Sequence, residues 1–564
     1  MAQATVHGHG GDHTVAAATA HGQQVMWTLS GAHVFPLYDA AVGGKEGVEA
    51  LGGDTRRAER EGPMRLVDVR NEATAVFAAE ASGKLTRNPG LAVVTAGPGV
   101  TNTVSGVASA YFNGSPLVVM GGRAPSNRWG TGALQELDHP PILQSITKDS
   151  FTLTDPNGAA TRIDEAFSLA GSPHRGPVFV DVPLDVVFAP GESAAPIGAR
   201  AAREPFDEEA ARDVAERLSR AQRPVVVLGG DVWFDAAETT ARELVTELGL
   251  PTITNGMGRG ILPKGHPCLV TRARSKAFNN ADLVVVIGSP LDFRLGYGLF
   301  GGKDGAVPAD VVHIADARPQ LAAHADLAGS VAGDLNAILT VIANHYSEVS
   351  SHSAWLADLQ RTAQAAVAAD QELLHSDADP IHPARIYGEL LPRLTDDTVV
   401  IGDGGDFVSF AGRFIEPMRP GNWLDPGPYG CLGTGLGYAA SARVHRPDSP
   451  VVLLMGDGAA GFSLMDVDTL VRHDLPVVMV VGNNATWGLE KHPMQFLYGY
   501  DVVADLRPTR YDEVVTALGG AGETVTQPGD IGAALDRALA SGVPYLVNVM
   551  TDPAAAYPRS TTGI

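Results

Sequence analysis

Two side chains that can bind a cation follow two neighbouring apolar runs of the sequence. Asp457 comes just after "VVLLM", and Asn484 comes just after "VVMVVGN". Continuous apolar runs predict strands buried on both faces, and the carboxyl ends of parallel strands meet at one edge of a sheet. A carboxylate and an amide oxygen at that edge are hard ligands that suit Mg²⁺ held together with phosphate oxygens. We therefore expect Asp457 and Asn484 to share one cation.

The apolar runs before Asp457 and Asn484 belong to a pattern that recurs along the whole chain. Short runs of Val, Ile and Leu end in Gly, Asp or Asn, and Ala-rich helical stretches separate them. This alternation predicts an α/β fold of doubly wound parallel sheets covered by helices. Ligands of such sheets bind beyond the carboxyl ends of the strands, where the Gly, Asp and Asn residues stand.

Two linker-like stretches divide the chain into three α/β units. Residues 189–205 are rich in Pro, Gly and Ala, and residues 347–380 are polar and partly helical. A chain of 564 residues is too long for one core, which agrees with three domains. The predicted segments are a flexible, histidine-containing tail at 1–22, domains at 23–190, 206–346 and 380–552, and a C-terminal tail at 553–564.

Composition narrows the class of partner. With 64 acidic against 41 basic residues the formal net charge is -23, which disfavours nucleic acid and anionic membranes as partners. No stretch approaches the ~20 apolar residues that span a bilayer. The two cysteines, Cys268 and Cys431, are far apart and form no metal-spacing motif, which suits a reducing compartment. We expect a cytoplasmic protein.

The spacing from Gly456-Asp457-Gly458 to Asn483-Asn484 resembles the thiamine-diphosphate motif of the group that includes acetolactate synthase, benzaldehyde lyase, oxalyl-CoA decarboxylase and 2-hydroxyacyl-CoA lyase. The resemblance implies three thiamine-diphosphate-binding-fold domains, with thiamine diphosphate and Mg²⁺ as cofactors. It also implies that Asp457, Asn484 and the carbonyl of Thr486 bind the cation. The cofactor-binding residues of this region would include Gly404, Gly458 and Ala459. Read alone, the two motifs are also compatible with ordinary turns after strands.

Two further elements carry the same resemblance. "VRNEATA" places Glu72 at the start of an Ala-rich helix, and "YGCLG" contains Gly430 and Leu432. The resemblance implies that Glu72 protonates the aminopyrimidine ring, that the Gly430 carbonyl accepts its amino group, and that Leu432 supports the bent cofactor. A glutamate in a first helical turn is also favoured by the helix dipole alone. "GLGYAA" after Leu432 matches a dinucleotide pattern only weakly, because no strand directly precedes it.

The resemblance also implies the domain order and the assembly. The order is a pyrimidine-binding domain at 23–190, a middle domain at 206–346 and a diphosphate-binding domain at 380–552. The cofactor of this group lies between two subunits, so we expect at least a homodimer, and a homotetramer by analogy. Related middle domains hold FAD or ADP. Here ADP is preferred, with Arg274 and Asp316 as candidate ligands; a solvated Arg and a helix-capping Asp are the plain alternative.

Family resemblance specifies the substrate less well than the cofactor. His33, Gln135 and Asn113 are placed by resemblance around the reacting carbon, and Glu490 is placed as a base for a substrate hydroxyl, although it could also face solvent. The C-terminal tail, with Arg559, and Arg413 are candidates for a lid and for acyl-CoA binding.

We therefore expect a lyase resembling the bacterial 2-hydroxyisobutyryl-CoA type of 2-hydroxyacyl-CoA lyase, which releases formyl-CoA and a ketone or aldehyde. The alternatives are a carboligase or decarboxylase without CoA, resembling benzaldehyde lyase or acetolactate synthase, and a catalytically silent binding protein of the same fold. Retention of the motif residues together argues against the silent protein.

Overall fold

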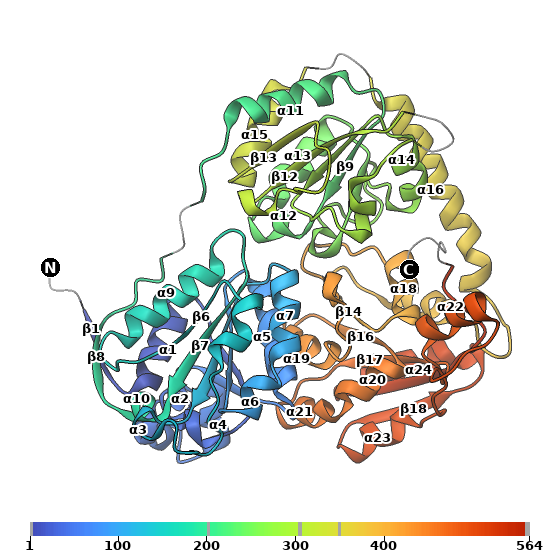
Figure 1. Cartoon of the computed structure of the whole chain (residues 1–564). Helices are drawn as coiled ribbons and strands as arrows, with labels where there is room; N and C mark the ends of the chain where they lie inside the picture. Colours follow the sequence, from blue (N-terminus) through green and yellow to red (C-terminus); the bar gives the residue numbers. More distant parts are fainter. Residues whose placement is uncertain (1–3, 200–202, 303–306, 348–350, 559–564) are drawn as a thin grey trace.

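The chain folds into three parallel sheets, each with helices on both faces (Figure 1). The structure is a computed structural model that describes residues 4–199, 203–302, 307–347 and 351–558. Every strand pair within the three large sheets is parallel. The α/β prediction with three doubly wound domains is confirmed.

The first domain contains a six-stranded sheet with the order β3-β2-β4-β5-β7-β6. Its strands are β2 (Val25–Thr28), β3 (Arg65–Asp68), β4 (Gly90–Val94), β5 (Leu117–Arg123), β6 (Asp149–Thr152) and β7 (Pro177–Pro183). Its helices are α1 (Gly10–Ala20), α2 (Phe35–Val42), α3 (Gly44–Ala50), α4 (Thr55–Glu61), α5 (Glu72–Thr86), α6 (Pro98–Thr101), α7 (Val104–Phe112), α8 (Pro140–Leu143), α9 (Ala159–Gly171) and α10 (Leu184–Phe188).

The middle domain contains a five-stranded sheet with the order β10-β9-β11-β12-β13. Its strands are β9 (Pro224–Leu228), β10 (Thr252–Thr254), β11 (Leu283–Ile287), β12 (Asp310–Ala315) and β13 (Gly329–Ala332). Its helices are α11 (Glu208–Arg220), α12 (Gly230–Phe234), α13 (Glu238–Glu247), α14 (Arg274–Asn280) and α15 (Leu335–His345).

The third domain repeats the six-stranded design with the order β15-β14-β16-β17-β19-β18. Its strands are β14 (Val399–Asp403), β15 (Trp423–Leu424), β16 (Val451–Gly456), β17 (Val478–Asn483), β18 (Ala521–Val525) and β19 (Tyr545–Met550). Its helices are α17 (Ala384–Leu390), α18 (Asp406–Phe414), α19 (Gly435–His445), α20 (Asp457–Ser463), α21 (Val467–Arg472), α22 (Gly488–Tyr498), α23 (Tyr511–Ala517) and α24 (Ile531–Ala540).

The first and third domains share one hydrophobic core through α5 and α19, which lie side by side in Figure 1. Asn71 begins α5 as its N-cap, with its side chain accepting a hydrogen bond from the N–H of Ala73. A Cβ on Gly437 of α19 would come within 3.0 Å of backbone atoms of α5, so only glycine permits this approach. The "GLGYAA" string therefore serves helix packing in this chain.

The N-terminal segment is not the flexible tail that the sequence predicted. β1 (Thr5–Gly8) pairs antiparallel with β8 (Gly191–Ala194), and α1 packs its buried Ala17 and Ala18 into the core of the first domain. Small residues make this contact, and no apolar run is present in this segment. The sequence pattern therefore did not predict an ordered element here. The pairing also orders part of the predicted linker at 189–205.

The second predicted linker is mostly one long helix, α16 (Ser353–Leu374), which runs from the middle domain to the third domain (Figure 1). Trp355 and Leu359 of α16 join a core cluster of the middle domain. No helix in the described part of the chain combines the length and the apolar character needed to cross a membrane. Cys268 and Cys431 are both free thiols.

Candidate active site

The predicted cation ligands converge at the carboxyl edge of the third sheet. β16 and β17 are neighbours, with Gly456 paired to Gly482, so Asp457 and Asn484 emerge side by side. Asp457 begins α20 and is 3% exposed. The loop after β17 is held by backbone hydrogen bonds from Leu506 to Ala485 (2.7 Å) and from Trp487 to Ala504 (2.8 Å).

The surroundings of Asp457 fit those of a cation ligand. Burial raises the pKa of Asp457 to about 6, although backbone N–H groups of Gly458, Ala485 and Thr486 oppose the shift. Its Oδ1 accepts a hydrogen bond from Gly458 at 3.0 Å, and its buried Oδ2 has no partner among the described residues. A hard cation would satisfy that oxygen, so the residues present fit Mg²⁺.

The predicted glycine and alanine residues line the same edge. Ala459 is buried, and a Cβ on Gly404 would lie 3.5 Å from the Ala459 side chain. Gly458 lies against the ring of Trp487, so closely that a Cβ there would be 2.3 Å from a ring carbon. Gly404, Gly458 and Ala459 thus lie together at the ends of β14 and β16, and the space beside Gly458 is occupied by the Trp487 ring.

Asp403 anchors the segment that contains Gly430 and Leu432. This residue was not predicted as part of the site. Its two carboxylate oxygens accept hydrogen bonds from the N–H groups of Gly433 (3.0 Å) and Gly435 (2.8 Å). Burial raises the pKa of Asp403 to about 7, against those two hydrogen bonds. The string "VVIGDGG" placed an acidic residue at a strand end, which was the available signal.

Gly430 is exposed and Leu432 is half-buried in the single chain. Close to Gly430, the exposed ring of Tyr429 stacks on Phe112 with 5.2 Å between the ring centroids. The segment is therefore fixed at its base by Asp403, while its predicted cofactor-binding residues face outward from this subunit's own core.

Glu72 stands at the first position of α5 and is buried, with 8% of its surface exposed. The side-chain amide of Asn102 donates a hydrogen bond to its Oε2 at 2.9 Å. Asn102 follows "TAGPGVT" and was missed because its partner is 30 residues away. Within the described residues, no hydrogen bond or ion pair joins Glu72 to Asp457 or Asn484.

His33 and Gln135 lie together at the carboxyl edge of the first sheet. The Nδ1 of His33 is 3.1 Å from the Oγ1 of Thr95, which directly follows β4. Gln135 packs beside Gly97, two residues further along the same loop. Burial lowers the pKa of His33, so its ring is neutral near pH 7.

Asn113 corrects one prediction, because the structure places it away from His33 and Gln135. It ends α7, which returns to the amino-terminal end of β5, the opposite edge of the sheet. Its Nδ2 donates to Glu80 at 2.8 Å and to the carbonyl of Pro426 at 3.1 Å. Asn113 thus joins the first and third domains. The structure does not place it at the reacting centre.

Glu490 lies in the first turn of α22, one turn beyond the predicted cation ligands, and its side chain is exposed in the single chain. At the start of the helix, Gly488 packs against the Asn484 side chain. The backbone thus carries Glu490 to the same edge as Asp457.

The predicted acyl-CoA residues receive less support. The guanidinium of Arg413 is bound to Asp370 of α16, at 3.1 Å and 2.5 Å, so its charge is already compensated. Arg559 lies outside the described residues. Before it, the N–H of Tyr557 bonds to the carboxylate of Asp406 at 3.1 Å, and its ring packs on Phe410. The start of the predicted tail therefore rests on α18.

A cavity of about 750 Å³ lies where the three domains meet, beyond the carboxyl ends of the middle sheet. Its lining includes Lys148, His174, Asp231, Asn255, Ser289 and Arg294.

The two predicted nucleotide ligands, Arg274 and Asp316, have partners within the chain, beside residues that line this cavity. The guanidinium of Arg274 bonds to the carbonyl of Arg294 and lies over the Phe278 ring. Asp316 is buried against His174 (3.0 Å) and Arg175 (3.3 Å). The roles of Arg274 and Asp316 as phosphate and ribose ligands stay a prediction, and each would have to exchange a partner for the nucleotide.

Comparison with known protein families matches all three domains. The N-terminal TPP binding domain of thiamine pyrophosphate enzymes matches residues 8–142, their central domain matches 211–342, and their C-terminal TPP binding domain matches 403–549. These ranges contain Glu72, Asp457 and Asn484.

Curated relatives match over almost the whole chain. A Mycobacterium tuberculosis protein named acetolactate synthase large subunit is 46% identical over 546 residues, which are 96% of this chain and 95% of that protein. A human protein named 2-hydroxyacyl-CoA lyase 2 is 31% identical over 559 residues, which are 91% of this chain and 84% of that protein. A Bos taurus protein of the same name is 32% identical over 556 residues.

Proposed function

Because the chain belongs to the thiamine pyrophosphate enzyme family, we propose that it is a lyase that cleaves a 2-hydroxyacyl-CoA, such as 2-hydroxyisobutyryl-CoA, to formyl-CoA and a ketone or aldehyde. That it is a thiamine-diphosphate-dependent enzyme follows from the family. The choice of a 2-hydroxyacyl-CoA as substrate is our proposal. It rests on the position of Glu490 at the edge of the predicted cation site.

The proposal gives each predicted site residue a role in the reaction. When bound, thiamine diphosphate supplies a nucleophilic carbon that adds to a carbonyl and accepts the electrons of the breaking carbon–carbon bond. Asp457, Asn484 and the Thr486 carbonyl would hold Mg²⁺ on its diphosphate. Glu72, oriented by Asn102, would exchange a proton with the aminopyrimidine. Glu490 would remove the proton from the 2-hydroxyl as the C1–C2 bond breaks.

A second function is favoured by a different observation. The relatives named acetolactate synthase share 46% identity with this chain, against 30–32% for those named 2-hydroxyacyl-CoA lyase. The ion pair between Arg413 and Asp370 also removes one of the expected CoA contacts. A carboligase or decarboxylase that acts on 2-oxo acids or aldehydes without CoA is therefore the competing proposal.

One experiment separates the two. The purified enzyme, loaded with thiamine diphosphate and Mg²⁺, is incubated with 2-hydroxyacyl-CoAs in one series and with 2-oxo acids in another, and products are identified by mass spectrometry. Formyl-CoA supports the lyase. Acetolactate or another 2-hydroxyketone, with no formyl-CoA from any thioester, would refute it in favour of the carboligase.

We also propose a homodimer as the smallest active unit, and a homotetramer as the expected assembly. The support is that Glu72 and the cation ligands stand on different domains without a direct bond, while Phe112 and Tyr429 expose apolar surface beside Gly430. A second subunit would cover this surface and complete the site. Light scattering after gel filtration tests the assembly.

The cavity between the three domains supports a narrower proposal, that it holds ADP in preference to FAD. Gly230, Gly256 and Gly288 at its strand ends allow a ligand to approach the backbone. Mass spectrometry of small molecules released from the denatured protein would identify a nucleotide or its absence.

A further inference from the structure

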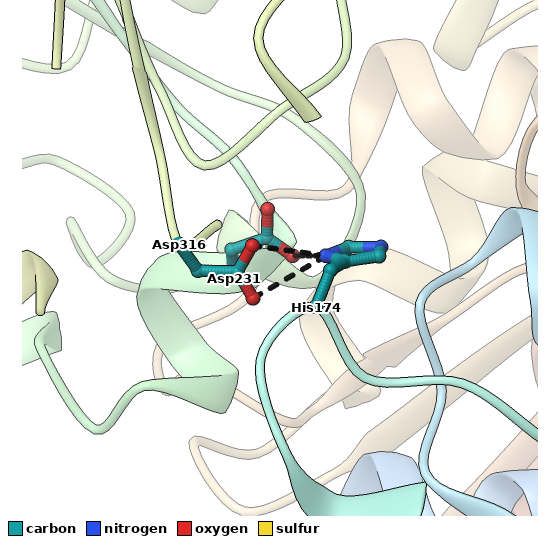
Figure 2. Close-up of side chains that lie close together, drawn as sticks. All are labelled: His174, Asp231 and Asp316. Carbon is teal, nitrogen blue, oxygen red and sulfur yellow. Dashed lines mark hydrogen bonds and ion pairs between the residues drawn. The ribbon is translucent and has the colours of Figure 1, made fainter. Parts of the chain in front are cut away.

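One side-chain cluster beside the cavity between the domains takes no part in the proposed lyase chemistry. It contains His174, Asp231 and Asp316, whose potential ligand atoms all lie within 4.8 Å of one another (Figure 2). We propose that this cluster is a site for a divalent transition-metal ion of the Zn²⁺ type, which joins the first domain to the middle domain.

The fold brings the three residues together from distant parts of the chain. His174 lies in the loop before β7 of the first domain, whereas Asp231 follows β9 and Asp316 follows β12 of the middle domain. β9 and β12 flank β11, and the N–H of Asp231 donates to the carbonyl of Gly288 (3.0 Å), which follows β11. That bond turns Asp231 back over the end of the central strand, toward Asp316.

The distances suit a small ion. The Nδ1 of His174 is 3.0 Å from one oxygen of Asp316 and 3.6 Å from one oxygen of Asp231. Ligand atoms bound to tetrahedral Zn²⁺ at about 2.0–2.2 Å are separated by about 3.3–3.6 Å. Small side-chain movements would therefore complete the geometry. Imidazole nitrogen with carboxylate oxygen is a donor set that Zn²⁺ and its neighbours accept.

Asp231 is the least compensated carboxylate of the cluster. Its exposed fraction is 8%, yet no hydrogen bond to its carboxylate occurs among the described residues, and its nearest cation is His174 at 3.6 Å. Buried carboxylates are normally paired or coordinate a metal. Burial and the charge of Asp316 raise the pKa of Asp231 to about 7, which shows how poorly its charge is compensated.

The positively charged side chains around the cluster leave negative charge that a divalent ion could balance. Arg175 bonds to Asp235 at 2.8 Å and to Asp316 at 3.3 Å, so one guanidinium serves two carboxylates. Lys148 is near, but its ammonium donates to backbone carbonyls of Leu169 (2.7 Å) and Ser172 (2.8 Å). Without a metal, a proton on His174 is the remaining counter-ion.

The ion would have a structural and an electrostatic effect. With three protein ligands, a tetrahedral ion keeps one position for water or for an anionic oxygen of a molecule in the cavity. Its binding would also hold the loop before β7 against the middle sheet. Both effects concern the cavity, not the edge that carries Asp457.

The test uses the full chain with the Asp457→Ala change in every sample and no thiamine diphosphate, so that the predicted Mg²⁺ site cannot contribute. Zinc is titrated into chelator-treated protein by calorimetry. We expect one zinc equivalent that Asp231→Asn removes or weakens by at least about 100-fold, since loss of a ligand should cost no less than loss of an outer-shell partner. Asp292→Asn, which alters a carboxylate of the same cavity that is paired with Arg294, should change nothing.

A second variant protects the test against misfolding. His174→Gln should also lose the equivalent, together with the visible absorption bands of bound Co²⁺, while circular dichroism stays unchanged. Zinc that remains bound at equal stoichiometry in both variants would lie elsewhere, for example at the N-terminal histidines, and would overturn the proposal. So would a starting protein that binds no zinc, because Arg175 and a proton on His174 would then balance the two carboxylates.

Discussion

The amide of Asn102 lies 2.9 Å from a carboxylate oxygen of Glu72 and is the only side chain in the described chain that hydrogen-bonds to it. Asn102 ends the short helix α6, whereas Glu72 begins α5, so the contact fixes the glutamate from a neighbouring loop. Orientation of a catalytic acid by a second residue is a general means of preorganisation.

Replacing Glu72 tests cofactor activation. Glu72→Gln should retain thiamine diphosphate but slow hydrogen–deuterium exchange at C2 of the bound cofactor by about 10² to 10⁴, because the acid–base partner is lost. Rapid-quench NMR measures the exchange. Asn102→Ala should slow it less, since the carboxylate remains; unchanged exchange in Glu72→Gln would transfer the role to another residue.

Replacing Asp457 tests the cation site. Asp457→Ala should abolish retention of thiamine diphosphate through gel filtration while leaving the circular dichroism spectrum unchanged, because a hard ligand is lost and the backbone of the strand end stays in place. Cofactor content is measured after denaturation. A variant that keeps a full complement of cofactor would show that Asp457 is not a ligand.

Replacing Glu490 tests the proposed base. Glu490→Gln preserves size, and cleavage of a 2-hydroxyacyl-CoA should fall by about 10² to 10⁴. Exchange at C2 should stay normal, because it depends on Glu72. Near-normal cleavage would contradict the role and would favour His33, with a site like that of benzaldehyde lyase.

Removing the C-terminal tail tests the acyl-CoA proposal. Truncation at Asp552 removes the contacts of Tyr557 with Asp406 and Phe410. If the tail closes over bound CoA, KM should rise and kcat should fall for an acyl-CoA, because closure binds substrate and excludes water. Full activity of the truncated enzyme would eliminate the lid.

The pKa of Asp403 predicts how stability depends on pH. Its pKa is about 7 in the folded chain and about 3.9 when unfolded, so the folded state holds the proton more tightly. The associated stability is greatest below pH 4 and is lost as pH rises through 7.

Relative to Asp403→Asn, which cannot ionise, the wild type should lose about 2 kcal/mol of unfolding free energy between pH 5 and 7. Urea titrations at both pH values measure it. Parallel pH profiles for the two proteins would mean that Asp403 stays ionised throughout.

The strand-end rule was enough to predict that Asp457 and Asn484 would emerge at one edge, because parallel strands present their carboxyl ends to the same edge of a sheet. Pairing partners were not predictable in the same way. Whether an arginine such as Arg413 is free depends on Asp370 of α16, which is 43 residues away in sequence and reaches it only in the folded chain.

The small residues of the N-terminal elements prevented their prediction from the sequence. Gly11 of α1 lies so close to α2 that a Cβ would be 1.9 Å from the carbonyl oxygen of Pro36. Such packing depends on the absence of side chains, and an apolar pattern cannot report it. The same holds for Gly437 between α19 and α5, which resembled part of a dinucleotide motif.

Asp370 of α16 has a practical meaning for dissecting this protein. It is 3% exposed and binds Arg272 of the middle domain on one side and Arg413 of the third domain on the other. An excised third domain that began at residue 380 would leave the Arg413 guanidinium without its carboxylate, and a middle domain ending at residue 346 would do the same to Arg272. A segment exchanged between homologues should therefore contain the middle domain, α16 and the third domain together. Such a segment keeps both ion pairs of Asp370 intact.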